Sequence, residues 1–127
     1  MNEDIVKRYQ EGERDFSYTS LVGANLAGVD LSEANFSGAD LRLVNFSGAN
    51  LAGANLTGAQ LQGANLNRAV VAGESFVGAD MSGCYVRGTD LSKSYIGNTK
   101  MAGVNLSEAC LDGVDLGEII LMVECKK

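Results

Sequence analysis

The apolar residues of this chain recur at every fifth position over most of its length. Counting by fives from residue 16 to residue 121 gives 22 positions, which hold 13 Leu, four Phe, two Met, two Val and one Ile. We call these residues the centres. Ala is the commonest residue two places before a centre, Asn or Asp one place before it, and Gly two places after it. The repeating five-residue unit, or pentad, is therefore A-(N/D)-L-x-G.

A period of five fits neither regular secondary structure. On an α-helix each centre would lie about 140° round from the last, and on a β-strand every second centre would point to the opposite face. The chain must instead turn once in each pentad, and the two residues after each centre form the corner. Gly at the second corner position supplies the positive φ of a type II turn. The pattern predicts a coil with Leu and Ala inside, whose turns stack at about 4.8 Å.

The tandem A-(N/D)-L-x-G units resemble the pentapeptide repeat family over about residues 14–123. The resemblance implies an all-β solenoid, a right-handed quadrilateral β-helix with four pentapeptides in each coil and about 5.5 coils in all. It also implies a bacterial source, and the style of the N-terminal segment is similar to that of short cyanobacterial members. In such a coil, residues four pentads apart lie one above the other.

The N-terminal segment departs from the repeat. Residues 2–12 predict a short helix, with Asn2 as its N-cap and Gly12 at its end. Ile5 and Tyr9 are four residues apart and share one face of this helix. We expect that face to lie on the first coil.

Three segments follow from this pattern: a capping helix over residues 1–13, the β-helix over 14–123 and a short tail over 124–127. Ile120 and Met122, in the last pentad, would point outward. Exposed apolar residues at the open end of a stack favour either fraying of that end or a contact with another molecule. We expect a monomer or a weak end-to-end dimer that meets through these two side chains.

Composition and charge reduce the range of possible functions. The chain has no His and a net charge of −6. It therefore lacks the commonest general base and metal ligand at neutral pH, and it contains neither a phosphate-binding loop nor a nucleophile elbow. We expect a protein that is not an enzyme and holds no metal or cofactor. Without a basic stripe we expect no direct binding of nucleic acid.

Cysteine use and hydropathy predict the compartment. Cys84, Cys110 and Cys125 are too few and too scattered for a disulfide framework, which favours a reducing environment. Cys84 takes an inward position, where we expect an inert core residue, and Cys110 an outward one. The charged N-terminus is no signal peptide, and no apolar run reaches the ~20 residues of a membrane span. We expect a cytoplasmic protein without a membrane partner.

Interruptions of the repeat concentrate between residues 68 and 100. Tyr85 and Tyr95 replace outward Asn or Asp, and Arg68 replaces a corner Gly. Arg68, Tyr85 and Arg87 fall on one face of adjacent coils, and Tyr and Arg commonly anchor interfaces. We predict that these three residues and Tyr95 contact an unknown protein partner. The simpler alternative is surface decoration, in which Arg87 pairs with Glu108 one coil on.

Glu74 occupies an inward position where the repeat has Ala. Burial of a lone carboxylate is costly, so the sequence favours a side chain that swings outward or pairs with Lys93. The alternative is a carboxylate held inside as part of a site.

The sequence thus predicts a non-enzymatic, rigid solenoid that acts as a protein–protein interaction module or scaffold. Leu and Phe fill the interior, and no insertion between pentads builds a pocket. The resemblance implies an alternative, because some family members are DNA-mimic inhibitors of a type II topoisomerase. Against it stand the small number of coils, the lack of a predicted C-terminal helix and the basic residues that offset the acidic charge. These basic residues are Arg42, Arg68, Arg87, Lys93 and Lys100.

Overall fold

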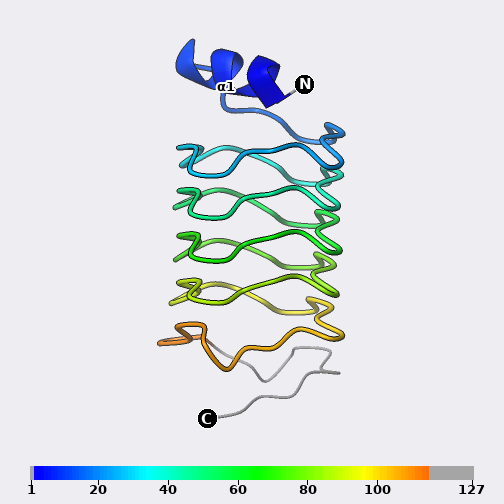
Figure 1. The fold of residues 1–127 in the computed structure, drawn as a ribbon, viewed down its shortest axis with the longest axis vertical. Helices are drawn as coiled ribbons and strands as arrows, with labels where there is room; N and C mark the ends of the chain where they lie inside the picture. The colour runs from blue at the N-terminus through cyan, green and yellow to red at the C-terminus, as the bar shows by residue number, and fades with distance from the viewer. Residues whose placement is uncertain (1, 115–127) are drawn as a thin grey trace.

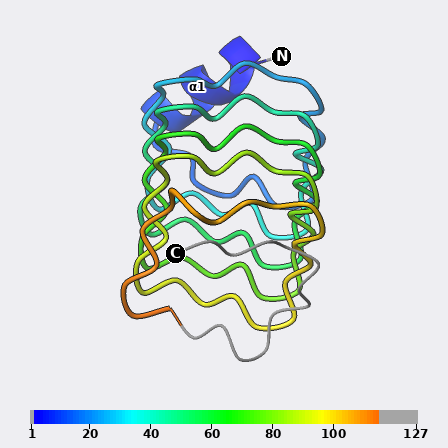
Figure 2. The ribbon, with the colours of Figure 1, turned by 60° about the horizontal axis from the view of Figure 1, so that its bottom comes forward.

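The protein is a stack of coils with one short helix at its N-terminal end (Figure 1). A computed structural model describes residues 2–114. Isolated parallel β-bridges join residues 20 apart, from Asp15–Asn35 to Asp90–Cys110. One coil therefore contains four pentads. Viewed closer to the long axis, the coils follow one another around a common centre (Figure 2).

Backbone hydrogen bonds between coils hold the stack together. The amide of a centre donates to the carbonyl of an outward residue on the next coil, as Phe36 N does to Asn55 O at 2.8 Å. The amide of an outward residue donates to the previous coil, as Asn55 N does to Ala34 O at 2.9 Å. Most backbone groups are satisfied in this way although each extended piece is too short to form a strand.

The corners have the conformation that the glycines predict. Ala54 N donates to Leu51 O at 2.9 Å, and Gly53 between them has a φ of 74°. The outward residue supports the corner as well, because its side-chain oxygen accepts the amide two residues later. Asn50 Oδ1, for example, accepts from Ala52 N at 3.0 Å. This bond gives a local reason for Asn and Asp at the outward positions.

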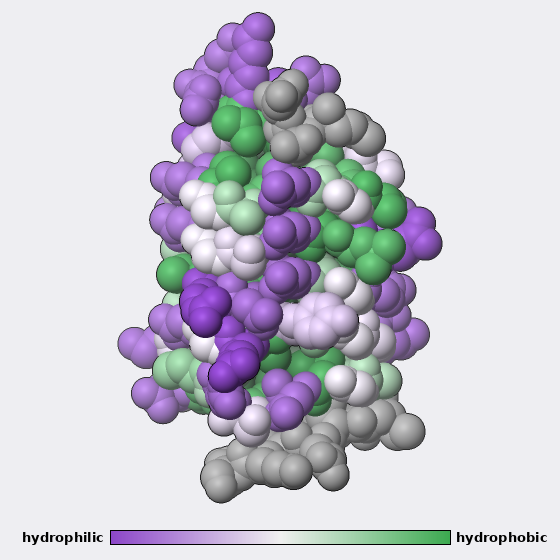
Figure 3. Space-filling model, viewed as in Figure 1, coloured by the Kyte–Doolittle hydropathy of each residue, from purple (hydrophilic) through white to green (hydrophobic). Residues whose placement is uncertain are grey.

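Outward positions stack coil upon coil. Figure 3 shows, on the face turned to the viewer, hydrophilic side chains in a column parallel to the long axis. Bridged pairs such as Asn25–Asn45 and Asn45–Asn65 continue such a column through successive coils. A residue that replaces Asn or Asp in such a column therefore has the same backbone position, and its side chain also points outward.

Six non-glycine residues at the second corner position share one arrangement. Their φ values lie between 58° and 64°, and they are Tyr18, Glu33, Leu43, Arg68, Lys93 and Asn98. Glu108 also holds such a position but has no positive φ. The side chain of Leu43 lies over Gly63, where an added Cβ would be 2.8 Å from Leu43 Cδ2. Tyr18 covers Gly38 in the same way. The glycine one coil on thus provides the space for each large corner side chain.

The centres form one continuous core. Phe16, Phe36, Phe46 and Phe76 are fully buried, as are most of the leucines between them. The rings of Phe16 and Phe36 stack with centroids 5.7 Å apart, and Phe46 meets Phe36 edge-on at 6.2 Å. Each fully buried side chain of this size contributes about 1.5–3 kcal/mol by transfer from water.

Helix α1 (Asn2–Gln10) packs on the first coils. Ile5 is buried in the same cluster as Phe16, and Tyr9 Oη donates to Ser32 O at 2.8 Å. The helix ends earlier than Gly12, because Gly12 adopts a φ of 104° and its amide donates back to Tyr9 O at 3.0 Å. Glu13 N donates to Arg8 O at 2.9 Å, which completes a Schellman motif.

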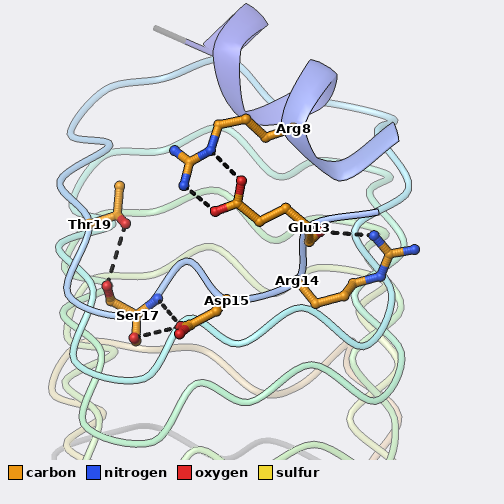
Figure 4. A network of polar contacts seen from close by, with 6 residues as sticks. All are labelled: Arg8, Glu13, Arg14, Asp15, Ser17 and Thr19. Carbon is orange, nitrogen blue, oxygen red and sulfur yellow. Dashed lines mark hydrogen bonds and ion pairs between the residues drawn. The ribbon is translucent and has the colours of Figure 1, made fainter. Parts of the chain in front are cut away.

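Polar side chains join α1 to the first coil (Figure 4). Arg8 forms a two-pronged ion pair with Glu13, in which Nε lies 2.8 Å from Oε1. Arg14 stacks its guanidinium 3.6 Å above the ring of Tyr9. Asp15 accepts hydrogen bonds from the amide and hydroxyl of Ser17, which lower the pKa of its carboxyl.

The structure describes no residue after Val114. Ile120, Met122 and the tail over 124–127 therefore lie outside the described residues, as does the last part of the repeat. Helix α1, in the described range, has too few residues and too little apolar character to span a membrane.

Candidate partner-binding surface

Tyr85 is presented on an intact backbone at an outward position. Its bridge to Asn65 is retained, and its amide donates to Ala64 O at 3.0 Å while its carbonyl accepts from Leu66 N at 2.7 Å. The side chain is 60% exposed. A phenol cannot accept the corner amide as an Asn side chain does, so it projects away from the coil. We call Arg68, Tyr85 and Arg87 the Tyr85 surface.

A residue of the previous coil replaces the missing corner bond at Tyr85. Asn67 Oδ1 accepts the amide of Arg87 at 2.8 Å, across a sequence separation of 20 residues. The amide of Asn67 itself donates to Asn65 Oδ1 at 2.9 Å. The corner after Tyr85 is therefore fixed from the neighbouring coil, which holds Arg87 beside the tyrosine.

Arg68 lies next to this corner with its charge unpaired. It adopts a φ of 61°, and its amide donates to Arg87 O at 2.8 Å. Its Cγ would lie 3.4 Å from a Cβ placed on Gly88, so the side chain runs along the next coil. Among residues 2–114 no carboxylate forms an ion pair with its guanidinium.

The ion pair between Arg87 and Glu108, which the surface-decoration alternative expects, is present. Arg87 Nε lies 2.7 Å from Glu108 Oε1, and the two side chains are 74% and 59% exposed. Exposed pairs of this kind contribute little to stability because water and salt screen them. A ligand carboxylate can therefore compete for Arg87 at small energetic cost.

The coil stack is interrupted beneath Tyr85. The bridges Asp80–Lys100 and Asp90–Cys110 flank this point, but the expected bridge from Tyr85 to Asn105 is absent from the described residues. At the corner after Tyr85, the amide of Gly88 donates to Glu108 O at 2.9 Å, whereas the repeat would pair it with the carbonyl of residue 107. The coils separate here into a depression. Its lining includes Asn67, Tyr85, Arg87, Asn105, Ser107 and Glu108.

Tyr95 belongs to a different part of the surface. It bridges to Ser75 and is 66% exposed. It follows Tyr85 by ten residues, half of the 20-residue coil, and therefore faces the opposite side of the stack. A second depression there is lined by Val77, Lys93 and Tyr95 among others. The structure groups Arg68, Tyr85 and Arg87 but does not bring Tyr95 to them.

The expectation for Glu74 is wrong. Its side chain neither swings outward nor pairs with Lys93: it is 1% exposed, and both carboxylate oxygens lack a hydrogen-bond partner. The residue two places before a centre points inward, and the coil bonds on either side fix that direction. Burial raises the pKa of the Glu74 carboxyl well above its ordinary value of 4.5. No second ionisable group lies at its oxygens, so the geometry assigns it no acid–base role.

The backbone at Glu74 also departs from the repeat. In every other described pentad the inward residue donates its amide to the centre before it, as Ala69 N does to Leu66 O at 2.9 Å. No such bond joins Glu74 N to Val71 O, and the amide of Ser75 donates to no carbonyl of the previous coil, although the Ser75 carbonyl still accepts from Leu56 N at 2.9 Å. The large buried side chain therefore costs the local turn two backbone hydrogen bonds.

Four consecutive inward positions of one coil hold Cys, Thr or Ser in place of Ala. The sequence pattern identified these residues as small but did not predict their hydrogen bonds. Each donates its side-chain hydrogen to a centre carbonyl of the previous coil. The four bonds run from Cys84 to Leu61, Thr89 to Leu66, Ser94 to Val71 and Thr99 to Phe76, at 2.9, 2.6, 3.0 and 2.8 Å respectively. Three of these carbonyls already accept a corner amide and use a second lone pair, whereas Val71 O, which receives no amide from Glu74, accepts the Ser94 hydroxyl. The polar groups are therefore buried with their hydrogen bonds made.

The cysteines lie where the repeat places them. Cys84 is buried, and burial raises the pKa of its thiol to about 12. Cys110 is exposed. Across residues 2–114, no cluster of three His, Cys, Asp or Glu side chains has an arrangement that could hold a metal ion.

These observations define the class: a solenoid of tandem five-residue repeats with a filled interior and a fixed outer surface. The family model described as pentapeptide repeats matches eight copies, over residues 15–48, 44–73 and 79–117. The chain belongs to the pentapeptide repeat family. No curated protein matches it.

Solved structures share the fold. A pentapeptide repeat protein from Nostoc Pcc 7120, alr5209, is 27% identical, with a TM-score of 0.50 and coverage of 96% of this chain and 94% of that one. Rfr23, from the cyanobacterium Cyanothece 51142, is 20% identical, with a TM-score of 0.54 and coverage of 99% and 100%. QnrB1, a plasmid-mediated fluoroquinolone resistance protein, is 20% identical with a TM-score of 0.57. This chain, 89% of which aligns, spans only 60% of the length of QnrB1.

Proposed function

We propose that this protein is a non-enzymatic, rigid interaction module or scaffold, and that a protein partner binds the Tyr85 surface. The observation that supports this most is an exposed Tyr85 beside Arg68, whose guanidinium has no ion pair among the described residues, with the backbone of both bonded to an adjacent coil. Tyr and Arg contribute strongly to interfaces. A surface that is already ordered loses little conformational entropy on binding.

The complete architecture is part of the proposal. Residues 1–13 act as a cap, and the β-helix is right-handed and quadrilateral, runs from 14 to 123 and has about 5.5 coils. Residues 124–127 form a tail. The 20-residue spacing of the bridges and the family membership support this arrangement. The protein is then either a monomer or a weak end-to-end dimer. Ile120 and Met122 would form the contact of that dimer.

The proposed location is the cytoplasm, where Cys84 and Cys110 would remain reduced as they are in the structure. Tyr95 serves as a separate contact on the opposite side of the stack. Neither surface is proposed to bind nucleic acid directly, because Arg68 and Arg87 form a local pair rather than a basic stripe.

Affinity capture from cells of the source organism tests the proposal. The wild-type chain is compared with the Tyr85→Ala/Arg87→Ala double variant and with Gln60→Ala, a matched change at an exposed outward position of another column. We expect one partner to be retained by wild type and Gln60→Ala but lost by the double variant. Recovery of no partner, together with turnover on a broad substrate panel, would overturn the proposal.

Inhibition of a type II topoisomerase by DNA mimicry is the competing function. The net charge of −6 and the fold shared with QnrB1 favour it. Arg68 and Arg87 count against it, because they place positive charge on one face of the described coils. A supercoiling assay separates the two functions: we expect no inhibition by micromolar protein, whereas inhibition would favour the DNA mimic.

A further inference from the structure

We propose that the depression beneath Tyr85 binds a short, extended segment of the partner that carries an acidic residue. This inference rests on the proposed function, because it names the kind of partner that the Tyr85 surface would take. Two independent features support it: unpaired backbone groups at the interrupted coil junction, and the arginines beside them.

The backbone at the junction has free hydrogen-bonding capacity. On the column of Tyr85, the preceding coils pair fully, as Leu66 N does with Tyr85 O at 2.7 Å. At the next junction no described residue accepts from the amide of Val86 or Asn105, and none donates to the carbonyl of Cys84. These groups border the depression, since Cys84, Val86 and Asn105 all line it. The coils stay bonded on either side, through Gly83 N to Ala102 O and Gly88 N to Glu108 O, each at 2.9 Å, so these groups form the wall of a depression and not an open sheet edge. The main chain of a peptide can bond such donors and acceptors.

The charges beside the depression select for a carboxylate. Arg87 and its ion-pair partner Glu108 line the depression. Arg68 lies at the adjoining corner, where its amide donates to Arg87 O at 2.8 Å and no described carboxylate pairs with its guanidinium. An incoming carboxylate can bind Arg68 and displace Glu108 from Arg87, with the charge-assisted geometry that guanidinium groups prefer. A lysine would instead meet two positive charges against the single carboxylate of Glu108. The exposed ring of Tyr85 covers the segment from one side.

An extended segment fits this site better than a small anion. An anion needs only the arginines, which would leave the amide of Val86 and the carbonyl of Cys84 without partners. A peptide satisfies the backbone groups and the charge together. Its binding therefore requires both the carboxylate and free peptide amides.

Peptide binding to the full chain tests the inference. Three fluorescent pools of short random peptides, with Glu, Gln or Lys fixed at the centre, are titrated and followed by anisotropy. We expect the Glu pool to bind about ten-fold more tightly than the Gln pool and the Lys pool not to bind. Arg68→Ala should weaken the Glu pool about ten-fold. Arg42→Ala, which removes an arginine already paired with Asp40, should change nothing.

A second experiment tests whether the peptide main chain is recognised. The best-binding peptide of the Glu pool is made again with the amides beside its Glu N-methylated, and its binding is measured. We expect binding to be lost, since a methylated amide cannot donate to Cys84 O. Equal binding of Glu and Lys pools, no binding, or full affinity in Arg68→Ala or after N-methylation would overturn the inference. A dimer that forms through this surface and depends on Arg68 would also overturn it. If a partner is captured through Tyr85 but no peptide binds, the inference fails while the proposed function stands.

Discussion

The amide of Arg87 donates to the side-chain oxygen of Asn67, which lies one coil earlier, at 2.8 Å. In pentads whose outward residue is Asn or Asp, this corner bond comes from that residue, as from Asn65, which accepts from the amide of Asn67. Tyr85 cannot supply it. The corner after Tyr85 is therefore held by an asparagine of the coil before it.

Asn67→Ala should destabilise the protein by about 1 kcal/mol, because the amide of Arg87 loses its acceptor. Urea unfolding measures the loss, and hydrogen exchange of the Arg87 amide shows whether it is local. Gln62→Ala is the control, since Gln62 holds the equivalent position one pentad earlier and bonds only the side chain of Asp80. Equal effects of the two changes would mean that the bond between coils does not hold the corner.

Gly38→Ala should cost more than Gly48→Ala. Both glycines have φ values near 66°, so alanine pays about 1 kcal/mol for the left-handed conformation at either site. At Gly38 the added Cβ also overlaps the ring of Tyr18, whereas nothing lies within 4 Å of one at Gly48. Thermal unfolding of the two variants measures the difference. Adding Tyr18→Ala should remove it, and persistence of the difference in that double variant would contradict the contact.

Glu74→Ala should stabilise the protein at neutral pH by about 1–3 kcal/mol, because it removes buried oxygens that lack partners. The folded-state pKa of Glu74 is raised above its ordinary value of 4.5, so the folded protein binds the proton more tightly than the unfolded chain. The wild type therefore loses stability as pH rises from about 4.5 towards the folded pKa.

The stability difference between Glu74→Ala and wild type should accordingly grow over that range, in urea unfolding at several pH values. The aspartates whose pKa values are lowered, such as Asp40 beside Arg42, are present in both proteins and cancel in the comparison. A variant less stable than wild type at pH 8 would show that the carboxyl has a partner in solution.

Cys84 should resist thiol reagents while the protein is folded, and Cys110 should react. Burial keeps Cys84 from solvent and raises the pKa of its thiol to about 12, so almost no thiolate forms at neutral pH. Mass spectrometry of native protein treated with iodoacetamide, after digestion, locates the label. Rapid labelling of Cys84 before unfolding would indicate that the coils open at this level.

The period of the centres was enough to predict the inward Leu and Ala side chains and the corner glycines. It did not predict which corners tolerate other residues. Which corners accept a large residue depends on the 20-residue coil, because the glycines one coil on provide the space for Leu43 and Tyr18. Once the coil length is known, the glycine at the matching position is visible in the sequence.

The surface was predictable only in part. The coil length was enough to predict that Arg68, Tyr85 and Arg87 lie together and that Arg87 pairs with Glu108. Each of these contacts joins residues about one coil apart. The broken ladder at Asn105 has no sequence signal, since Asn105 fits the repeat. Glu74 was assigned wrongly because the cost of a buried carboxylate was weighed without its pKa shift, which allows the acid to remain neutral inside.

Site-specific photo-crosslinking tests the central claim most directly. A photoreactive phenylalanine analogue is placed at position 85 in one protein and at the exposed outward position 60 in another, and both are irradiated in cells of the source organism. We predict that position 85 crosslinks to one protein, that position 60 does not, and that Arg68→Ala weakens the crosslink at 85. Equal crosslinking from both positions, or none from position 85, would contradict the assignment of this surface to a protein partner.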